Sequence, residues 1–258
     1  MIEVKNVNKS FDGKQILHDV SCTFYTGKTN LIIGQSGSGK TVLMKSIVGL
    51  LRPDSGKIEF DGRDLLTMNQ KQVKELRKEI GMLFQGSALF DSETVLGNVM
   101  FPLVMFSGMT QAEMRDRAMF CLERVNLKGA DSKYPSEISG GMQKRVAIAR
   151  AIALNPKYLF CDEPNSGLDP RTSIVIDELL SDITHEYGIT TIINTHDMNS
   201  VLGIGENIVF LNKGHREWVG NMHEIYKTTN EALTHFVFAT DLFLKVREYL
   251  IANDKEVK

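Results

Sequence analysis

The fold of this chain is decided by one stretch of sequence, Gly34-Gln35-Ser36-Gly37-Ser38-Gly39-Lys40-Thr41. It satisfies the pattern G-x-x-x-x-G-K-[ST], and it lies between a strand-like apolar run and a helix-like segment. Glycines let the backbone curl so that successive N–H groups point at phosphate oxygens, and the dipole of the following helix adds to the attraction. Lys40 can reach the β and γ phosphates, and the Thr41 hydroxyl can ligate Mg²⁺.

We call residues 34–41 the phosphate loop. A glycine turn without a ligand is the alternative interpretation, but the position between a strand and a helix favours nucleotide binding. The residues predicted to bind ATP here are Gly34, Ser36, Gly37, Ser38, Gly39, Lys40 and Thr41.

The segments around the phosphate loop alternate between strand-like and helix-like patterns. Short β segments occupy residues 1–33, and a turn at 53–56 precedes another strand at 57–60. Continuous apolar runs at 158–161 and 189–194 are typical of parallel strands that are buried on both faces. Helical patterns fill 41–50 and 172–187 and most of the region from about 85 to 150. The chain is therefore predicted to be an α/β sandwich with a mainly parallel sheet and a helical insertion.

Composition narrows the class of protein. The net charge of -2 gives no reason to expect nucleic acid as a partner. Three cysteines, Cys22, Cys121 and Cys161, are far apart and are interpreted as buried apolar residues in a reducing compartment. The first residues lack the basic and apolar regions of a signal peptide. No stretch approaches the roughly 20 apolar residues that cross a bilayer, so a cytoplasmic protein is expected.

Two adjacent carboxylates follow the apolar run at 158–161. Asp162 is expected to hold Mg²⁺ together with Thr41, and Glu163 is expected to act as the general base on the attacking water. Such a base typically contributes about 10²–10⁴-fold in rate. The alternative is a solvated strand end, which the phosphate loop makes the weaker interpretation.

A second glycine motif, Ser139-Gly140-Gly141-Met142, precedes an alanine-rich helix. A serine and two glycines at a helix N-terminus form a second anion site, although a simple helix cap is the alternative. Here the chain resembles the ABC ATPase family, whose signature reads Leu-Ser-Gly-Gly-Gln; this chain has Ile138 and Met142 at the two ends. In that family, the signature of one subunit caps the nucleotide held by the other. The resemblance therefore implies a head-to-tail dimer in which Ser139, Gly140 and Gly141 contact ATP.

Further matches to the family extend over nearly the whole chain. Gln85 matches the glutamine that contacts Mg²⁺ and water and senses the membrane partner. Asp169 ends the D-loop (residues 166–169), which crosses the dimer interface, and His196 matches the histidine that contacts the γ-phosphate and orients the base. Phe11 matches the aromatic residue that stacks on adenine, with a core phenylalanine as the alternative. Gln85, Glu163 and His196 are thus the catalytic candidates, and Thr41, Gln85 and Asp162 are the candidates for binding Mg²⁺.

The resemblance also implies an architecture and partners. It predicts a P-loop NTPase with a RecA-like core, an N-terminal antiparallel β subdomain and a helical insertion at about 86–150, all within a domain of residues 1–230. Residues 231–258 form a tail. Apolar residues at 236, 239, 243, 246 and 250 predict one helical stripe, either packed on its own domain or reaching a partner. The family places such subunits on the cytoplasmic face of the inner membrane, beneath separate permease subunits.

Several residues resemble the Mla/Mkl-type ATPases that serve MCE-protein systems and move phospholipids or related lipids. Small residues after Gln85 lie where the family receives the coupling helix of the permease. This resemblance implies an MCE protein and a small regulatory subunit as further partners. The alternatives are another ABC importer, with these residues varying neutrally, or a non-transport ATPase of the iron–sulfur assembly type. The resemblance rests on residues 85–92, Thr94-Val95, Asn98-Val99, Met142 and residues 194–198.

Overall fold

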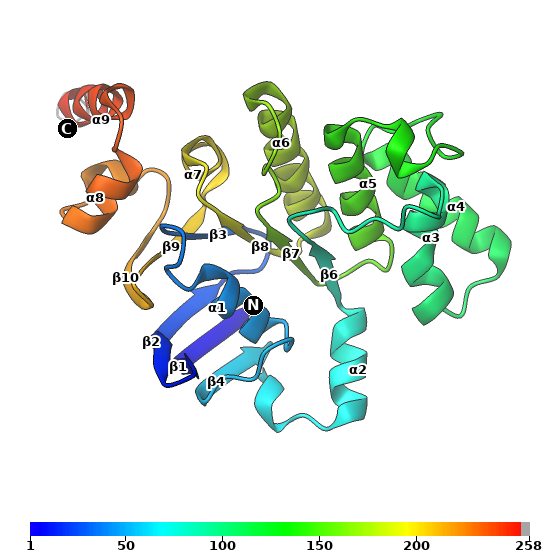
Figure 1. Ribbon diagram of the computed structural model, residues 1–258, viewed down its shortest axis with the longest axis horizontal. Helices are drawn as coiled ribbons and strands as arrows, with labels where there is room; N and C mark the ends of the chain where they lie inside the picture. Colours follow the sequence, from blue (N-terminus) through cyan, green and yellow to red (C-terminus); the bar gives the residue numbers. More distant parts are fainter. Residues whose placement is uncertain (254–258) are drawn as a thin grey trace.

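The computed structural model describes residues 1–253 and has a mixed six-stranded sheet at its centre (Figure 1). Its strand order is β10-β9-β3-β8-β7-β6, and every pair is parallel except β10 with β9. The strands are β3 (Thr29–Ile33), β6 (Ile80–Leu83), β7 (Tyr158–Asp162), β8 (Thr190–Thr195), β9 (Asn207–Asn212) and β10 (His215–Gly220). The phosphate loop therefore leaves the sheet from a central strand, as the apolar run before it predicts.

A second, four-stranded sheet of order β2-β1-β4-β5 lies beside the first and is antiparallel. Its strands are β1 (Ile2–Phe11), β2 (Lys14–Phe24), β4 (Ser55–Phe60) and β5 (Arg63–Asp64). Asp12 and Gly13 both have positive φ, 48° and 78°, which gives the tight turn between β1 and β2. The predicted α/β fold, with a parallel core and an antiparallel N-terminal sheet, is confirmed.

One helix follows the phosphate loop, others cover the large sheet, and three form a group of their own at one end of the molecule. They are α1 (Lys40–Ile47), α2 (Gln70–Lys78), α3 (Val95–Phe106), α4 (Gln111–Arg124), α5 (Gly140–Ile152), α6 (Pro170–Tyr187), α7 (Met198–Ile204), α8 (Glu231–Val237) and α9 (Asp241–Asn253), with short 3-10 helices at Leu65–Thr67, Pro135–Glu137 and Ile225–Lys227. Helices α3, α4 and α5 pack on one another at one end of the molecule (Figure 1). Thr110 and Glu113 form a capping box at the start of α4.

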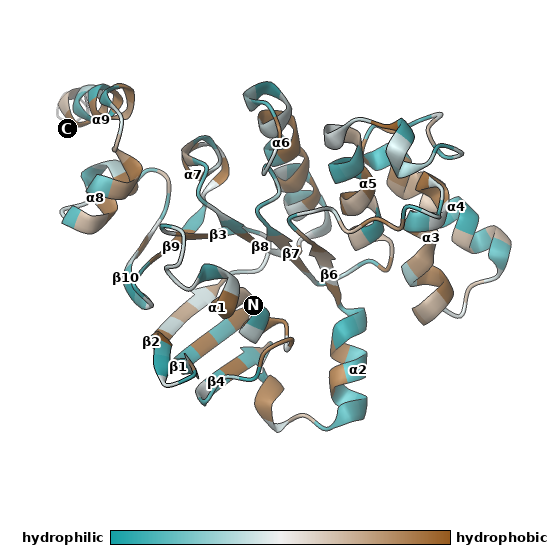
Figure 2. Ribbon diagram, viewed as in Figure 1, coloured by the Kyte–Doolittle hydropathy of each residue, from teal (hydrophilic) through white to brown (hydrophobic). Residues whose placement is uncertain are grey.

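Two hydrophobic cores lie on the two faces of the large sheet. One fills the space between that sheet and helices α3 to α7, and the other lies between the sheet, α1 and the N-terminal sheet. Figure 2 shows the central strands as hydrophobic, whereas α2 alternates hydrophilic and hydrophobic residues along its length. All three cysteines are free and buried. Within residues 1–253, no helix is long and apolar enough to cross a bilayer.

The tail differs from the single helical stripe that its sequence predicts. It forms two helices, α8 and α9, separated at 238–240, where Thr240 accepts a hydrogen bond from the N–H of Phe243. Phe236 and Phe243, which belong to the predicted stripe, pack on the domain, whereas Leu242, at 69 % exposure, faces away. Residues 254–258, which the predicted tail includes, lie outside the described residues. Figure 1 places α8 and α9 at the opposite end of the molecule from α3, α4 and α5.

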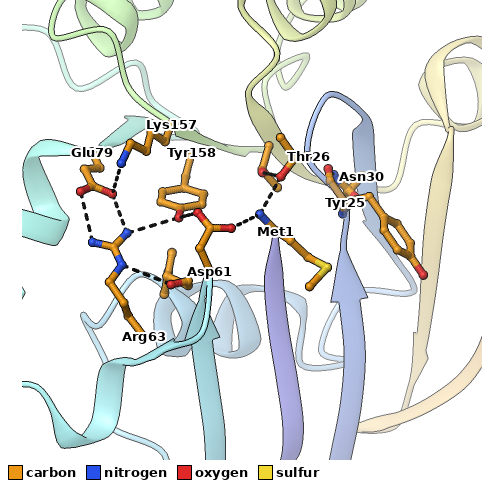
Figure 3. Close-up of polar contacts among 11 residues, drawn as sticks. Met1, Tyr25, Thr26, Asn30, Asp61, Arg63, Glu79, Lys157 and Tyr158 are labelled. Atoms are coloured by element: carbon orange, nitrogen blue, oxygen red, sulfur yellow. Dashed lines mark hydrogen bonds and ion pairs between the residues drawn. The ribbon is translucent and has the colours of Figure 1, made fainter.

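A network of polar side chains joins the N-terminal sheet to the start of β7 (Figure 3). Tyr158 donates a short hydrogen bond to Asp61, and Arg63 donates to Glu79 at 3.1 and 2.6 Å. The Lys157 ammonium lies 3.5 Å from Glu79, so this carboxylate faces two cations. These contacts fasten the N-terminal sheet to the amino ends of the parallel strands.

Candidate functional site

The phosphate loop follows β3 in a conformation that only glycine allows at its two ends. Gly34 has φ 150°, and a Cβ there would lie 2.2 Å from the carbonyl oxygen of Leu211. Gly39 has φ 103°, and a Cβ there would lie 2.9 Å from a methyl carbon of Leu17. Strand β9 and strand β2 therefore press on the loop from two sides. Within the loop, the Ser38 N–H donates to the Gln35 carbonyl at 3.1 Å, which closes a tight turn.

Lys40 is the first residue of α1 and is buried. Its ammonium donates hydrogen bonds to the carbonyl oxygens of Gly34, at 2.7 Å, and Gln35, at 3.2 Å. Burial lowers the pKa of Lys40, and the charges of Glu163 and Asp162 partly oppose that effect. The side chain is thus held by its own loop, close to both carboxylates, where a phosphate can replace the carbonyl contacts.

The two carboxylates lie at the carboxyl end of β7. Asp162 is its last residue, and Glu163 follows with φ 50°, in the left-handed region that disfavours residues other than glycine. The Glu163 N–H donates to the carbonyl of Asn194 at 3.0 Å, which fixes this turn to the end of β8. The Nδ1 atom of His196 lies 2.9 Å from one carboxylate oxygen of Glu163 and 2.8 Å from the other. Glu163 thus combines a strained backbone with a side chain that contacts His196.

Most of the predicted site residues line one cavity of about 940 Å³, whereas Gly34, Ser38 and Asp162 lie behind its lining. Gln85 and Glu163 border it together with His196, and Phe11, a residue that is 42 % exposed, also belongs to its lining. From the phosphate loop, the lining includes Gln35, Ser36, Gly37, Gly39, Lys40 and Thr41. The structure therefore brings together, around a single cavity, predicted site residues that are up to 185 positions apart in the sequence (11 to 196).

Phe236 also lines this cavity, and sequence reasoning did not assign it there. Its ring stacks on that of Phe210 in β9, with centroids 5.5 Å apart, and α8 is anchored by the buried Leu233 and Val237. The only signal in the sequence is the apolar spacing of the tail, which does not separate a cavity wall from a packing residue.

Both the side chain and the backbone of Gln85 have hydrogen-bond partners. The side-chain NH₂ of Gln85 lies 3.5 Å from the Ser166 hydroxyl, and the backbone carbonyl of Gln85 accepts a short hydrogen bond from the ammonium of Lys144. Lys144 is 4 % exposed, and burial lowers its pKa. This lysine lies on α5, directly after the Ser139 motif, so it links that helix to Gln85. The sequence alone did not indicate a role for Lys144.

The loop after Gln85 has an unusual shape that one arginine maintains. Ser87 and Ala88 both have positive φ, 62° and 48°. Arg150, at the other end of α5 from the Ser139 motif, donates to both of their carbonyl oxygens at 2.7 Å. The two left-handed residues thus depend on Arg150, whose guanidinium satisfies the carbonyls they expose.

Four residues predicted to contact ATP do not line the cavity in the structure of residues 1–253: Ser139, Gly140, Gly141 and Asp169. Ser139 caps α5, accepting from the Met142 N–H at 3.3 Å, and Asp169 caps α6. A Cβ on Gly141 would lie 2.7 Å from the Thr172 methyl group, so the two helix starts are packed together. One chain therefore separates the predicted second anion site from the first.

Asn165, which directly precedes the D-loop, belongs to a buried polar cluster. The Asn165 amide donates to Asp177 of α6 at 2.9 Å and to the Ser200 hydroxyl of α7 at 3.0 Å. Burial raises the pKa of Asp177 to about 6. Because α7 begins shortly after His196, this cluster connects the D-loop to the segment that carries the histidine.

The residues predicted to bind Mg²⁺ offer oxygen donors of the type that this hard cation prefers. Asp162 supplies a carboxylate, Thr41 a hydroxyl and Gln85 an amide oxygen. Two enclosed oxygens nearby, Ser38 Oγ and Asn194 Oδ1, have no hydrogen-bond partner. No cluster of three or more His, Cys, Asp or Glu side chains able to hold a metal occurs among residues 1–253. Asp162, Thr41 and Gln85 would hold a Mg²⁺ ion together with phosphate oxygens and water.

Comparisons with known proteins agree with this geometry. The family model described as "ABC transporter" matches residues 17–166. The probable ribonucleotide transport ATP-binding protein Mkl of Mycobacterium leprae is 40 % identical over 230 residues, or 89 % of this chain. The chain spans 66 % of that relative, just under two thirds of its length. The methionine import ATP-binding protein MetN of Clostridioides difficile is 39 % identical over 95 % of this chain and 76 % of its own length.

A solved structure extends the likeness to a nucleotide-bound state. It is described as the dimeric structure of a post-hydrolysis state of the ATP-binding cassette MJ0796 bound to ADP and Pi. It superposes with a TM-score of 0.78 and 33 % sequence identity, covering 86 % of this chain and 99 % of that one.

Proposed function

The chain belongs to the ABC transporter family and carries its ATPase domain, and from this premise we propose that it powers lipid transport with an MCE-type system. As an ATP hydrolase of this family, it binds ATP and works with a second cassette and with permease subunits. The mycobacterial and clostridial relatives are named for ribonucleotide and methionine transport. The choice of phospholipids or related lipids as cargo rests on residues of this chain.

The observation that carries the catalytic proposal is the meeting of the phosphate loop, Glu163 and His196 around one cavity. The loop N–H groups and Lys40 hold the phosphates, and Phe11 supports the adenine ring. Glu163 accepts the proton of the attacking water, while His196 keeps the carboxylate oriented. Thr41, Asp162 and Gln85 would hold Mg²⁺, which neutralises phosphate charge when it is bound.

The separation of the Ser139 motif from the cavity supports a head-to-tail dimer of this chain. In that arrangement Ser139, Gly140, Gly141 and Asp169 of one copy close the phosphate loop of the other. ATP bound between the two copies then stabilises the dimer, and hydrolysis lets the copies separate. The start of α5, at Gly140 and Gly141, offers a positive dipole end for this contact, whereas the first N–H groups of α6 already donate to Asp169.

An exposed apolar surface on the helical part supports a permease partner. We call it the α3 patch, and Figure 2 shows the free end of α3 as hydrophobic. It adjoins the loop that Arg150 shapes, since Phe90 of that loop packs on Phe101 with ring centroids 4.6 Å apart. Through this contact the chain would sit on the cytoplasmic face of the inner membrane. The patch consists of Phe90, Phe101, Val104, Met105 and Phe106, each at least 40 % exposed.

The lipid assignment is supported by the same loop. Gly86, Ser87 and Ala88 leave a narrow, small-sided turn beside the α3 patch, in which Ser87 is buried. An iron–sulfur assembly ATPase, which needs no membrane partner, gives no reason for the α3 patch to be exposed. An MCE protein and a small regulatory subunit remain part of the proposal on the resemblance to Mla/Mkl-type ATPases.

Permease docking is tested by co-purification from solubilised membranes. Val104→Glu on α3 and Val219→Glu on β10 make the same change at two exposed valines, at 59 % and 42 % exposure. We expect the α3 variant to lose the co-purifying polytopic membrane protein and the β10 variant to keep it. Both isolated chains should hydrolyse ATP normally, and equal retention of the partner by both would refute docking at the α3 patch.

Cargo is tested on the purified complex in proteoliposomes that contain a fluorescent phospholipid. We expect ATP to drive phospholipid transfer and phospholipid to stimulate hydrolysis, with a Glu163→Gln complex as the inactive control. Stimulation by methionine or ribonucleotides, without phospholipid transfer, would replace the lipid proposal and leave the ATPase assignment intact.

The contribution of the tail to assembly stays a proposal of its own. On α9, Phe243 packs inward and the Arg247 guanidinium donates to the carbonyls of Tyr226 and Thr228, while Leu242 and Tyr249 are more than two-thirds exposed. A deletion should begin at 241, because Phe236 lines the ATP cavity. Unchanged dimer and complex assembly after that deletion would assign α9 to its own domain alone.

A further inference from the structure

Asn194 touches both members of the acidic pair. It lies on β8, opposite Asp162 in the register of β7 and opposite Ile32 in that of β3, and it is fully buried. Its side-chain NH₂ donates to a carboxylate oxygen of Asp162 at 3.1 Å, and its backbone carbonyl accepts from the Glu163 N–H at 3.0 Å. One residue therefore orients the side chain of the first carboxylate and the backbone of the second.

The remaining polar atom of Asn194, its Oδ1, is enclosed and has no partner. The Asp162 carboxylate can only accept when it is ionised, so the NH₂ group must face it and the oxygen must be the atom left unpaired. An unpaired buried acceptor is costly and uncommon, and it calls for an explanation.

A second buried asparagine shows that this is not a general property of the sheet. Asn30, on β3, is equally buried near the other end of the strands. Its NH₂ donates to the carbonyls of Tyr25, Lys28 and Thr191, and its oxygen accepts from the Tyr25 N–H and the Asn207 amide. The structural asparagine is thus saturated, whereas the asparagine beside Asp162 keeps one acceptor free.

We propose that Asn194 is a positioning residue for Mg²⁺ binding: it holds the Asp162 carboxylate toward the metal, and its free oxygen accepts a hydrogen bond from a metal-bound water. Side chains behind metal ligands commonly fix ligand orientation in this way. The neighbours on the same face, Ile32 and Ile192, are apolar, so Asn194 is the polar exception beside the carboxylate. The inference rests on the ATP hydrolase activity and is independent of the cargo.

The test measures Mn²⁺ binding, because Mn²⁺ replaces Mg²⁺ and is visible by electron paramagnetic resonance. Asn194→Leu keeps the size of the side chain and Asn194→Val suits a strand, and both remove the donor and the acceptor. With a non-hydrolysable ATP analogue present, we expect Mn²⁺ affinity to fall by about 10–100-fold. Affinity for a fluorescent ATP analogue in EDTA should be unchanged, which establishes that the variant is folded.

Ile192→Val is the matched control, since it alters the same face of the same strand two residues earlier and should leave Mn²⁺ affinity unchanged. A double mutant then separates positioning from general damage. Because Asn194 acts in part through Asp162, adding Asn194→Val to Asp162→Asn should cause a smaller further loss of Mn²⁺ affinity than Asn194→Val causes alone. Wild-type Mn²⁺ affinity in a folded Asn194 variant, or losses that simply add in the double mutant, would overturn the proposal.

Discussion

The two ends of strand β7 are built on opposite principles. At the amino end, Tyr158, Asp61 and Arg63 belong to a network in which each charged group meets an opposite charge or a hydrogen-bond donor (Figure 3). At the carboxyl end, five residues further on, Glu163 adopts a left-handed backbone conformation and Asn194 leaves an acceptor unpaired. Both ends lie on the same strand, so the difference is not one of fold.

This contrast separates stability from function within a single element. Saturated polar contacts lower the free energy of the folded state, whereas strained and unpaired groups raise it and are retained where a ligand can use them. We therefore expect substitutions at the carboxyl end to change chemistry with little effect on unfolding. Substitutions at the amino end should do the reverse.

Glu163→Gln gives the largest expected effect. The amide keeps the shape of the side chain but cannot accept the proton of the attacking water, so steady-state ATP hydrolysis should fall by about 10²–10⁴-fold. ATP binding should survive, and a stable ATP-bound dimer should accumulate in size-exclusion chromatography. The urea midpoint of the variant should match that of the wild type.

Near-normal hydrolysis by Glu163→Gln would remove the carboxylate from its role as base. A large shift of the urea midpoint would contradict the contrast between the two ends of β7, because the carboxyl end would then contribute to the free energy of unfolding as well.

Tyr158→Phe should show the converse behaviour. The Tyr158 hydroxyl donates to the Asp61 carboxylate, and a hydrogen bond to a charged group contributes about 1.5–3 kcal/mol. Because the Asp61 side chain is 50 % exposed, solvent screening favours the lower end of this range. Urea unfolding should report a loss in that range, while the rate of ATP hydrolysis per folded molecule stays at the wild-type value. A reduced rate at full folding would mean that the two ends of β7 are coupled.

The sequence predicts the functional end better than the structural end. Gly34 and Gly39 lie in the phosphate loop, where backbone requirements leave little freedom of choice, so a local pattern suffices to find them. The contacts of Asp61 with Tyr158 and of Arg63 with Glu79 join positions 97 and 16 residues apart, and no local spacing encodes such pairs.

The unpredicted parts of the candidate site have the same origin. Phe236 reaches the cavity only because α8 packs beside β9, and Lys144 reaches Gln85 only because α5 packs beside β6. The break in the tail at 238–240 also escaped prediction, since the apolar spacing alone continues through it. Tertiary packing, which periodicity cannot show, decides these three features.

The smallest expected effect concerns the pH dependence of the amino end. Hydrogen bonds from Arg63 hold the pKa of Glu79 below its usual value, despite the opposing effect of burial, and Lys157 adds to the lowering. A carboxyl group whose pKa is lower in the folded state stabilises the fold fully above its unfolded pKa. That contribution is lost as pH falls through the folded value, which lies below the ordinary value of about 4.3.

The urea midpoint of the wild type should therefore exceed that of Glu79→Gln at neutral pH, and the difference should shrink as the solution is acidified below about pH 4. Arg63 is partly exposed, so solvent screening should keep the difference smaller than the loss from Tyr158→Phe. Protonation of other groups at low pH destabilises both proteins alike, so the difference between their urea midpoints reports on Glu79 alone. A difference that stays constant with pH would show that the ion pair does not contribute, leaving Tyr158 and Asp61 as the only tested source of stability at this end of β7.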